Sequence, residues 1–264
     1  MMHRAYTART QAVHTPCTYT RTVGAGMLTL LVAIGLTAKP AISQTVETFS
    51  LPAGCEAWVT VQAKDCTVEH NFTCEGDPEG LKQRVTLDEE GMTYLGATDN
   101  ESQWIRSFHP RSGHSEELEE NPRDPASLTE LIETGIDTYD FRTISPEIGV
   151  TRFVGQDSLT GNVVTIDGVT LEETQFNITA YSEDGTELWS AEGNEYISRD
   201  WRMFQAGPGT VTLPTETYEE DDSPVEYIFP GEPGFLSANP KHGCGLTLSS
   251  SPVTALKEYL NVDL

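Results

Sequence analysis

The chain has 264 residues and contains 41 acidic side chains against 16 lysines and arginines. All of the acids follow Ser43, so the 221 residues from Gln44 onward hold 12 basic and 41 acidic side chains, a formal charge of −29. So negative a surface repels nucleic acid and anionic lipid headgroups, which excludes nucleic-acid binding. A saline habitat would select such a surface without any specific partner. Plentiful aromatic and β-branched residues exclude a disordered acidic tail, and a chain of this length can bury one sizeable core.

Residues 27–38 (MLTLLVAIGLTA) form an apolar stretch typical of the core of a secretory signal. Ala41 and Ser43 follow at the spacing of a cleavage site, and the segment before the stretch has no acid but three arginines, Arg4, Arg9 and Arg21. At its longest the stretch has 16 residues, whereas a membrane-spanning helix needs about 20. A buried core helix, the alternative, fits these flanks less well.

We therefore predict that residues 1–43 are a signal peptide whose true start lies downstream of Met1, near Met27. Residues 44–264 are predicted to be a single exported β-rich domain, periplasmic or secreted, with no membrane span in the mature chain.

Four cysteines follow the leader: Cys55, Cys66, Cys74 and Cys244. In an exported chain this even number predicts two disulfides. Cys66 and Cys74 fall at opposite ends of one predicted strand, too far apart for a bridge. Two connectivities remain. A hairpin turning at residues 62–66 slightly favours Cys55–Cys74 with Cys66–Cys244, and the other is Cys55–Cys66 with Cys74–Cys244.

Two other roles for these cysteines are weaker. Residues 51–55 (LPAGC) look like a lipoprotein attachment site, but Cys55 lies well past the apolar core, and its lipidation would leave an odd number of cysteines. Cys244 lies two residues after His242, but no signature of a cysteine nucleophile surrounds it.

The first half of the exported part predicts strands, a loop and a helix. Alternating apolar residues and turn clusters predict strands at 57–61, 67–74, 82–87, 92–97 and 103–108. Residues 109–123 are polar, with two prolines, and predict a long loop that is the best candidate for a domain boundary. A helix of about ten residues should follow, with Asp124 as N-cap, Pro125 at its first position and Gly135 at its end.

Residues 149–213 predict an antiparallel meander. Its strongest hairpin signals are Asp167-Gly168 and Asp184-Gly185. Strands are expected at 150–155, 162–166, 169–181, 186–192, 195–204 and 209–213. Val169 and Leu171 lie at odd positions of the strand at 169–181, whereas Phe176 and Ile178 lie at even positions. This change from one face to the other predicts a bulge at 173–175.

Beyond the meander, residues 219–222 predict a solvated loop, 225–229 a strand and 252–260 a short helix. The expected fold is mainly β, an antiparallel meander that forms a curved sheet or open barrel with one or two short helices.

Residues 108–114 (FHPRSGH) contain His109 and His114, and Glu116 and Glu117 follow closely. Two imidazoles and a carboxylate can bind zinc. However, the spacing matches no standard motif, and a flexible polar loop would hold the ligands poorly, so no metal and no cofactor are predicted. His70, on one face of a predicted strand with Val68 and Phe72, is expected to be a core histidine.

No catalytic residue is assigned. Residues 155–161 (GQDSLTG) place their glycines too far from Ser158 for a nucleophile elbow and predict a turn instead. Paired carboxylates for glycoside cleavage cannot be selected among 41 acids.

Trp104, Trp189 and Trp201 fall in predicted strands, where core packing is their simplest role. A more specific hypothesis is that Phe176, Trp189 and Trp201 line an apolar cavity enclosed by a curved sheet.

The segments around 166–169, 184–189 and 195–199 resemble exported proteobacterial proteins of uncharacterised families. The meander is similar to the open half-barrel of bacterial lipoprotein carriers (LolA-like). This resemblance implies a cavity for acyl chains or another hydrophobic ligand, and it assigns no binding residue.

These observations favour an exported non-enzymatic protein whose partner is a hydrophobic small molecule or an envelope protein. The first alternative is a hydrolase whose site combines scattered acids with His109 or His114, and the second is a structural or envelope-interaction protein. An apolar cavity lined by Phe176, Trp189 and Trp201 would favour the non-enzymatic protein that binds a hydrophobic ligand. A cleft that gathers the two histidines with acids would favour the hydrolase.

Overall fold

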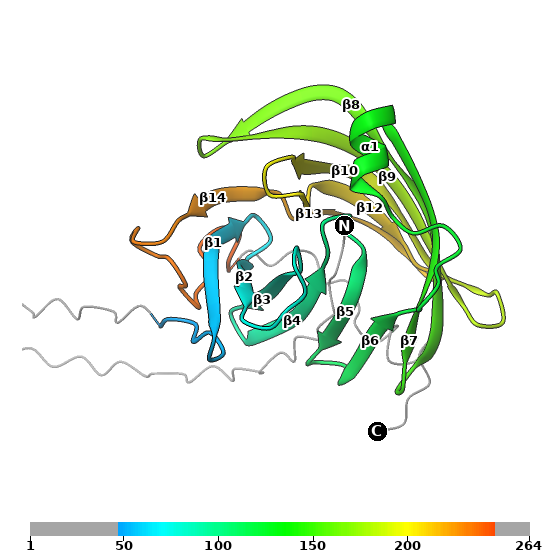
Figure 1. Cartoon of the computed structure of the whole chain (residues 1–264), viewed down its shortest axis with the longest axis horizontal. Helices are drawn as coiled ribbons and strands as arrows, with labels where there is room; N and C mark the ends of the chain where they lie inside the picture. Colours follow the sequence, from blue (N-terminus) through cyan, green and yellow to red (C-terminus); the bar gives the residue numbers. More distant parts are fainter. Residues whose placement is uncertain (1–46, 246–264) are drawn as a thin grey trace, which may run out of the picture.

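The structure, a computed structural model, describes residues 47–245, and in them one antiparallel sheet curls around an inner face (Figure 1). The predicted mainly β fold with an open, curved sheet is confirmed. The predicted signal peptide (1–43) and C-terminal helix (252–260) lie outside the described residues. The first seven elements in chain order are β1 (Cys55–Ala63), β2 (Val68–Cys74), β3 (Lys82–Asp88), β4 (Gly91–Thr98), β5 (Trp104–His109), β6 (His114–Leu118) and α1 (Leu128–Thr134).

The later elements are β7 (Ile136–Ser145), β8 (Gly149–Ile166), β9 (Val169–Ser182), β10 (Glu187–Ser198), β11 (Met203–Gln205), β12 (Pro208–Thr212), β13 (Thr217–Asp221) and β14 (Pro224–Ile228). No helix within residues 47–245 is long and apolar enough to cross a membrane.

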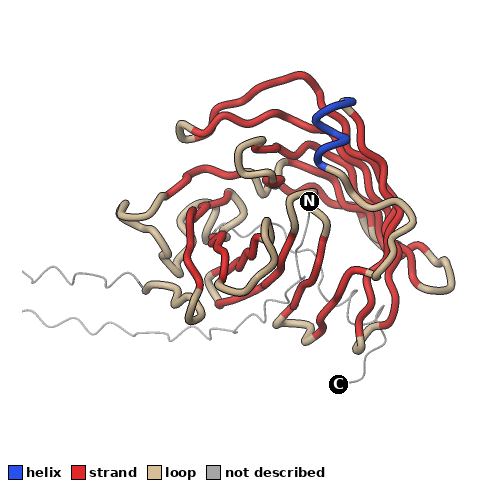
Figure 2. The backbone as a smooth tube through the Cα atoms, in the orientation of Figure 1, coloured by secondary structure: helices blue, strands red, loops and turns tan. Residues whose placement is uncertain are grey.

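The strand order forces the sheet to curl. Neighbours run β13-β12-β10-β9-β8-β7-β6-β5-β4-β3-β2-β1-β14, with β11 paired to β10. β13 and β14 therefore lie at opposite edges, yet only Asp222 and Ser223 separate them in the chain. Because this link spans at most about 11 Å, the two edges have to meet at one corner. Figure 2 shows the strands winding around to this corner.

Contacts from the β1–β2 turn hold the corner in place. The backbone N–H of Lys64 donates to the carbonyl of Ser223 at 3.1 Å. Its ammonium forms an ion pair with Asp221 at 2.7 Å. The link between the two edges is thus tied to the beginning of the sheet.

The tip of the β8–β9 hairpin covers one face of β1. Asp167 and Gly168 both have positive φ, 46° and 81°, as the predicted two-residue turn requires. The Asp167 carboxylate accepts a hydrogen bond from the backbone N–H of Tyr227 at 2.9 Å. Apolar residues of the tip and of β1 and β14 pack together, including Val164, Ile166, Leu171, Val59, Val61 and Tyr227.

The predicted bulge at 173–175 is wrong in its position. The register shift lies in β8, between Leu159 and Val163, while β9 pairs regularly with β10 through this region. The change in parity has another cause. Leu171 packs toward β1 on one face of β9, whereas Thr174 is buried on the other face.

The opposite face of β1–β4 is covered by two segments, residues 47–51 and 229–245, which we call the strap. They pair with each other, since the N–H of Phe49 donates to the carbonyl of Leu236 and that of Ala238 to Glu47, both at 2.7 Å. Apolar strap side chains, Phe49, Leu51, Phe235 and Leu236, pack on Ala57, Val68, Phe72, Val85 and Leu87. On β2 and β3 the apolar residues therefore lie under the strap, and alternation leaves polar residues for the inner face, whereas β1 also has apolar residues, Val59 and Val61, on its other face under the β8–β9 tip.

Helix α1 begins three residues later than predicted. Ser127 is the N-cap, and its hydroxyl accepts from the N–H of Glu130 at 3.1 Å. Asp124 is not available for capping because it bridges Asp140 through backbone hydrogen bonds. The predicted stop at Gly135 is confirmed, with φ of 87°. Leu128 and Leu131 pack against Ile197.

Several predicted loops are strands instead. Residues 109–123, expected to be a loop, contain β6, residues 155–161 lie inside β8, and residues 219–221 lie in β13. β10 runs unbroken through Gly193, where two strands were expected, and Trp201 lies in the turn that follows it. β7 was not predicted. The strands that were missed share one physical reason. Their apolar residues do not alternate cleanly, and their strand conformation comes from hydrogen bonds with neighbouring strands.

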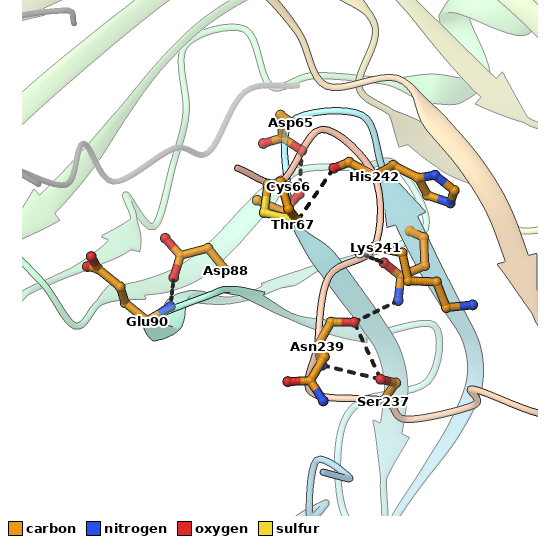
Figure 3. The surroundings of a disulfide bond; sticks show 11 residues. Asp65, Cys66, Thr67, Asp88, Glu90, Ser237, Asn239, Lys241 and His242 are labelled. Atoms are coloured by element: carbon orange, nitrogen blue, oxygen red, sulfur yellow. Dashed lines mark hydrogen bonds between the residues drawn. A yellow bond between two sulfur atoms is a disulfide. The ribbon is translucent and has the colours of Figure 1, made fainter. Parts of the chain in front are cut away.

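The favoured disulfide connectivity is confirmed. Cys55 and Cys74 lie opposite each other in the β1–β2 ladder and are bonded. Cys66, in the turn that follows β1, is bonded to Cys244 of the strap. The N–H of Cys66 also donates to the carbonyl of His242 at 2.9 Å. Figure 3 shows Ser237, Asn239, Lys241 and His242 of the strap on the same side of the β1–β2 hairpin as this disulfide. Neither Cys55 nor Cys244 therefore has a free thiol for lipidation or catalysis.

The two disulfides should differ in their contribution to stability. They close loops of 178 and 19 residues, which correspond to about 5 and about 3 kcal/mol in the chain-entropy description. We expect the Cys66→Ser/Cys244→Ser variant to unfold at lower guanidinium concentration than the Cys55→Ser/Cys74→Ser variant. Equal midpoints, or the reverse order, would contradict this expectation.

His70 is a core histidine, as predicted. It is fully buried, its Nδ1 lies 3.0 Å from the hydroxyl of Thr60, and its ring stacks on Phe49 of the strap. Burial lowers its pKa to about 4, against the opposing effect of a hydrogen bond with the backbone of Ser237. His70 is therefore neutral in the fold at neutral pH.

This lowered pKa makes the stability depend on pH. An unfolded histidine binds a proton near pH 6.5, whereas folded His70 does so only near pH 4, so stability is lost as pH falls between these values. We expect the wild-type protein to lose about 2 to 3 kcal/mol more than His70→Gln between pH 7 and pH 4.5, measured by urea unfolding. Equal losses in the two proteins would show that His70 is not the source.

Candidate functional site

The β5–β6 hairpin brings two predicted candidate residues face to face. His109 is the last residue of β5 and His114 the first of β6, and they are direct partners in the ladder. The turn between them is closed by a hydrogen bond of 2.8 Å from the N–H of Gly113 to the carbonyl of His109. Ser107 and Glu116 are the partners two residues further along. Because side chains alternate along a strand, all four side chains share one face.

His109, His114 and Glu116 form a compact group, which we call the His–His–Glu cluster. Their ligand atoms all lie within 4.8 Å of one another. His109 Nε2 lies 3.4 Å from Glu116 Oε2, and the two imidazole rings stack with centroids 4.4 Å apart. His109 and Glu116 are 5% and 8% exposed, while His114 is half-buried. The cluster is thus largely withdrawn from solvent but reachable at His114.

Hydroxyl groups contact each member of the cluster, and two of them hold a ligand in orientation. Thr143 of β7 donates to Glu116 Oε1 at 2.8 Å, which leaves Oε2 directed at His109. Ser107 Oγ lies 3.1 Å from His109 Nε2 and donates to Glu116 Oε2 at 3.4 Å, so this hydroxyl contacts the ligand atoms themselves and a bound ion would displace it. The hydroxyl of Ser112 lies 2.8 Å from His114 Nδ1, so Nε2 of that ring remains available as a ligand. Such outer contacts fix the orientation of ligating side chains in metal sites.

The ionisation of the cluster suits metal binding. Burial opposes the charge of Glu116, but hydrogen bonds from His109 and Thr143 outweigh it and lower the pKa of the carboxyl. Burial, followed by the neighbouring His109, lowers the pKa of His114. The carboxylate is therefore ionised and His114 neutral at neutral pH, which are the forms that bind metals.

The distances within the cluster fit a shared ion. Two ligand atoms 3.4 Å apart, each about 2.05 Å from one zinc ion, subtend an angle of about 110°, close to tetrahedral. A hydrogen bond of that length would be weak. Two imidazoles and one carboxylate leave a fourth position for water or another ligand.

Other groups near these residues are unsuitable as ligands. Glu117, the next acid in the sequence, is exposed and lies on the opposite face of β6. Cys66, Cys244 and Glu89 also gather within ligand distance, but the two sulfurs are bonded to each other.

The three residues of the hypothetical apolar cavity do not come together. Phe176 is 2% exposed and packs in the inner-face core with Trp104, Phe141 and Phe153. Trp189 packs at the border of that core, 6.1 Å from the ring of Phe153. Trp201 belongs to a separate cluster with Trp58 and Tyr227. Two pockets within residues 47–245, one beside Arg84 and one beside Phe141, have linings that include none of the three.

The sequence revealed His109, His114 and Glu116 but not the hydroxyls around them. A four-residue turn separates His109 from His114, and Ser107 and Glu116 lie two residues further from the turn on either side. In a hairpin this spacing places all four side chains on one face, but the sequence was not recognised as a hairpin. Thr143 could not be found in this way because β7 was not predicted.

Comparisons with known proteins found no matching family model, no matching curated protein and no matching solved structure. The resemblance to lipoprotein carriers therefore stays a prediction.

Proposed function

We propose that this chain is an exported, non-enzymatic protein that binds a divalent transition-metal ion, best zinc, through His109, His114 and Glu116. The observation that carries the proposal is the placement of three ligand atoms within 4.8 Å on one hairpin, with hydroxyls that hold two of them in orientation. The sequence argument against a metal assumed a flexible loop, whereas these residues lie on paired strands.

Export is supported by the cysteines. Both disulfides join segments that the fold brings together, and such bonds persist in oxidising compartments. The periplasm or the cell exterior also suits the proposed signal peptide. A strongly acidic surface raises the local concentration of cations, which favours metal capture without selecting a particular ion.

Zinc suits the ligand set better than magnesium or calcium. Those hard cations prefer six or more oxygen ligands, whereas imidazole nitrogen suits zinc, copper and nickel. Two nitrogens and one oxygen with a tetrahedral angle between two of them favour zinc among these ions.

A zinc-dependent hydrolase is a second candidate because three protein ligands leave one position open. In catalytic zinc sites a water molecule takes that position and its pKa falls to about 7. The half-buried His114 leaves the cluster accessible from one side, as a substrate would require.

The proposal of an apolar ligand has less support. It would need Phe176, Trp189 and Trp201 around one cavity, and these side chains pack in two separate clusters.

We expect the full chain, expressed with its leader and purified in oxidised form, to bind one zinc ion per chain in isothermal titration calorimetry. His114→Ala should weaken binding by at least about tenfold, because it removes one of three ligands. Thr143→Val should also weaken it by about tenfold, since Glu116 loses its orienting hydrogen bond. His242→Ala, which removes a histidine far from the cluster in sequence, is the matched control and should bind like the wild type.

Absence of stoichiometric zinc binding, or an equal loss in His114→Ala and His242→Ala, would refute the proposal. Zinc-dependent hydrolysis of a nitrophenyl ester that disappears in His114→Ala but not in His242→Ala would favour the hydrolase instead.

A further inference from the structure

A second site lies on the same inner face, nearer the start of the sheet. It is a pocket of about 40 Å³ between β2–β5 and the short strand β11, large enough for about three water molecules. Its lining combines polar and aromatic side chains, namely Asn71, Lys82, Arg84, Tyr94, Thr98, Ser102, Trp104, Met203 and Phe204, with Gly96. We call it the Arg84 pocket.

Two buried donors in this lining have no hydrogen-bond partner within residues 47–245. They are Nδ2 of Asn71, a residue only 1% exposed, and Nε of Arg84. Leaving such groups unsatisfied costs about 1–3 kcal/mol each, and more for a charged group. Both belong to residues that line the pocket, but neither nitrogen is reached by solvent, so an acceptor in the pocket satisfies them only after the two side chains shift toward it.

The guanidinium of Arg84 is held by contacts that leave Nε uncommitted. Its Nη1 lies 3.7 Å from Glu69, beyond hydrogen-bond distance, and its central carbon lies 5.2 Å from the ring centroid of Tyr94. Burial acts against its charge, but Glu69, Tyr94 (which also forms a hydrogen bond with the guanidinium) and Glu195 outweigh burial and raise the pKa of Arg84. Arg84 therefore keeps its positive charge in the recess, where Glu69 and the buried Glu195 offset part of it.

Lys82 adds a second cation to the lining. Its ammonium donates to the carbonyls of Gly80 and Asp99 at 3.2 and 3.3 Å and to Asn100 Oδ1 at 2.8 Å. These acceptors are neutral but occupy the three N–H donors of the ammonium, and Asp99 and Glu101 offset part of its charge, so Lys82 adds positive charge to the lining without a free donor.

The remaining walls suit a small organic body. Trp104, Met203 and Phe204 supply apolar surface. Gly96 has no side chain, and a Cβ there would lie 1.9 Å from the hydroxyl oxygen of Tyr94, so the glycine allows the Tyr94 ring to lie across β4. Sites with mostly apolar walls and a few converging polar groups are typical of small-molecule binding.

We propose that the Arg84 pocket binds the carboxylate of a small organic acid, of about the size of propionate. Arg84 Nε and Asn71 Nδ2 each donate one hydrogen bond to a carboxylate oxygen, a charge-assisted contact in the case of Arg84. The pocket is separate from the His–His–Glu cluster, so this proposal stands whether or not the protein binds zinc.

The direct test is a two-dimensional NMR titration of the oxidised full chain with sodium propionate, in the presence of EDTA. We expect selective shifts of the Arg84 Nε–H, the Asn71 side-chain amide and the Trp104 indole signals, with a dissociation constant of roughly millimolar size for so small a ligand. Propionamide, which has the same shape without the charge, should bind at least about tenfold more weakly.

Variants of the two proposed donors test whether these side chains bind the carboxylate. Asn71→Leu, which keeps the branching of the side chain but removes its amide, and Arg84→Lys, which keeps the charge but removes Nε, should each weaken propionate binding at least about tenfold. His242→Ala, which changes a strap residue outside both the pocket lining and the cluster, should bind propionate like the wild type, and the EDTA present keeps metal ions from contributing. Unchanged Arg84 and Asn71 signals in the wild-type titration, or equal shifts with propionamide, would overturn the proposal and leave a water-filled pocket, whether or not the variants fold.

Discussion

Two residues between β13 and β14 impose the constraint on which the rest of the structure depends. These strands lie at opposite ends of the path of paired strands in a 14-stranded sheet, yet Asp222 and Ser223 alone connect them. A flat sheet cannot satisfy so short a link, so the sheet has to curl until its edges meet. The curl creates an inner face, and the β1–β2 turn holds the corner through Lys64, which contacts both Asp221 and Ser223.

The curl also separates two kinds of surface on the first strands. The strap buries the apolar side of β1–β4, and His70 lies beneath it as a neutral core residue. On β2 and β3 the inner side is left with polar residues on neighbouring strands, while the β8–β9 tip covers Val59 and Val61 of β1. Tyr94 lies between the two proposed sites, because its ring is 5.2 Å from the Arg84 guanidinium and 5.5 Å from the ring of His109. A cation-binding cluster and an anion-binding pocket thus occupy one face.

The site shows where reasoning from the sequence succeeds and where it fails. His109, His114 and Glu116 could be selected because their chemistry is visible in their residue types. Their geometry was misjudged, since β6 (HSEEL) has almost no apolar residues and therefore lacks the alternation that indicates a strand. Its strand conformation comes from backbone pairing with β5 and β7, which are non-local contacts. Thr143 escaped notice for the same reason.

The sequence by itself determined the features that depend on short stretches of chain. The two-residue turn at Asp167-Gly168, the longer hairpin loop that contains Asp184-Gly185, the helix stop at Gly135 and the β1–β2 hairpin follow from local conformational preference and strand alternation. That hairpin favoured the Cys55–Cys74 bond over the alternative connectivity without deciding it. Only the tertiary structure decided that Phe176 and Trp201 pack apart, that Arg84 and Asn71 face one pocket, and that Ser112 and Thr143 orient a histidine and a glutamate. Most of these relations join residues far apart in the chain, and no local pattern records them because they arise from how the whole sheet curls.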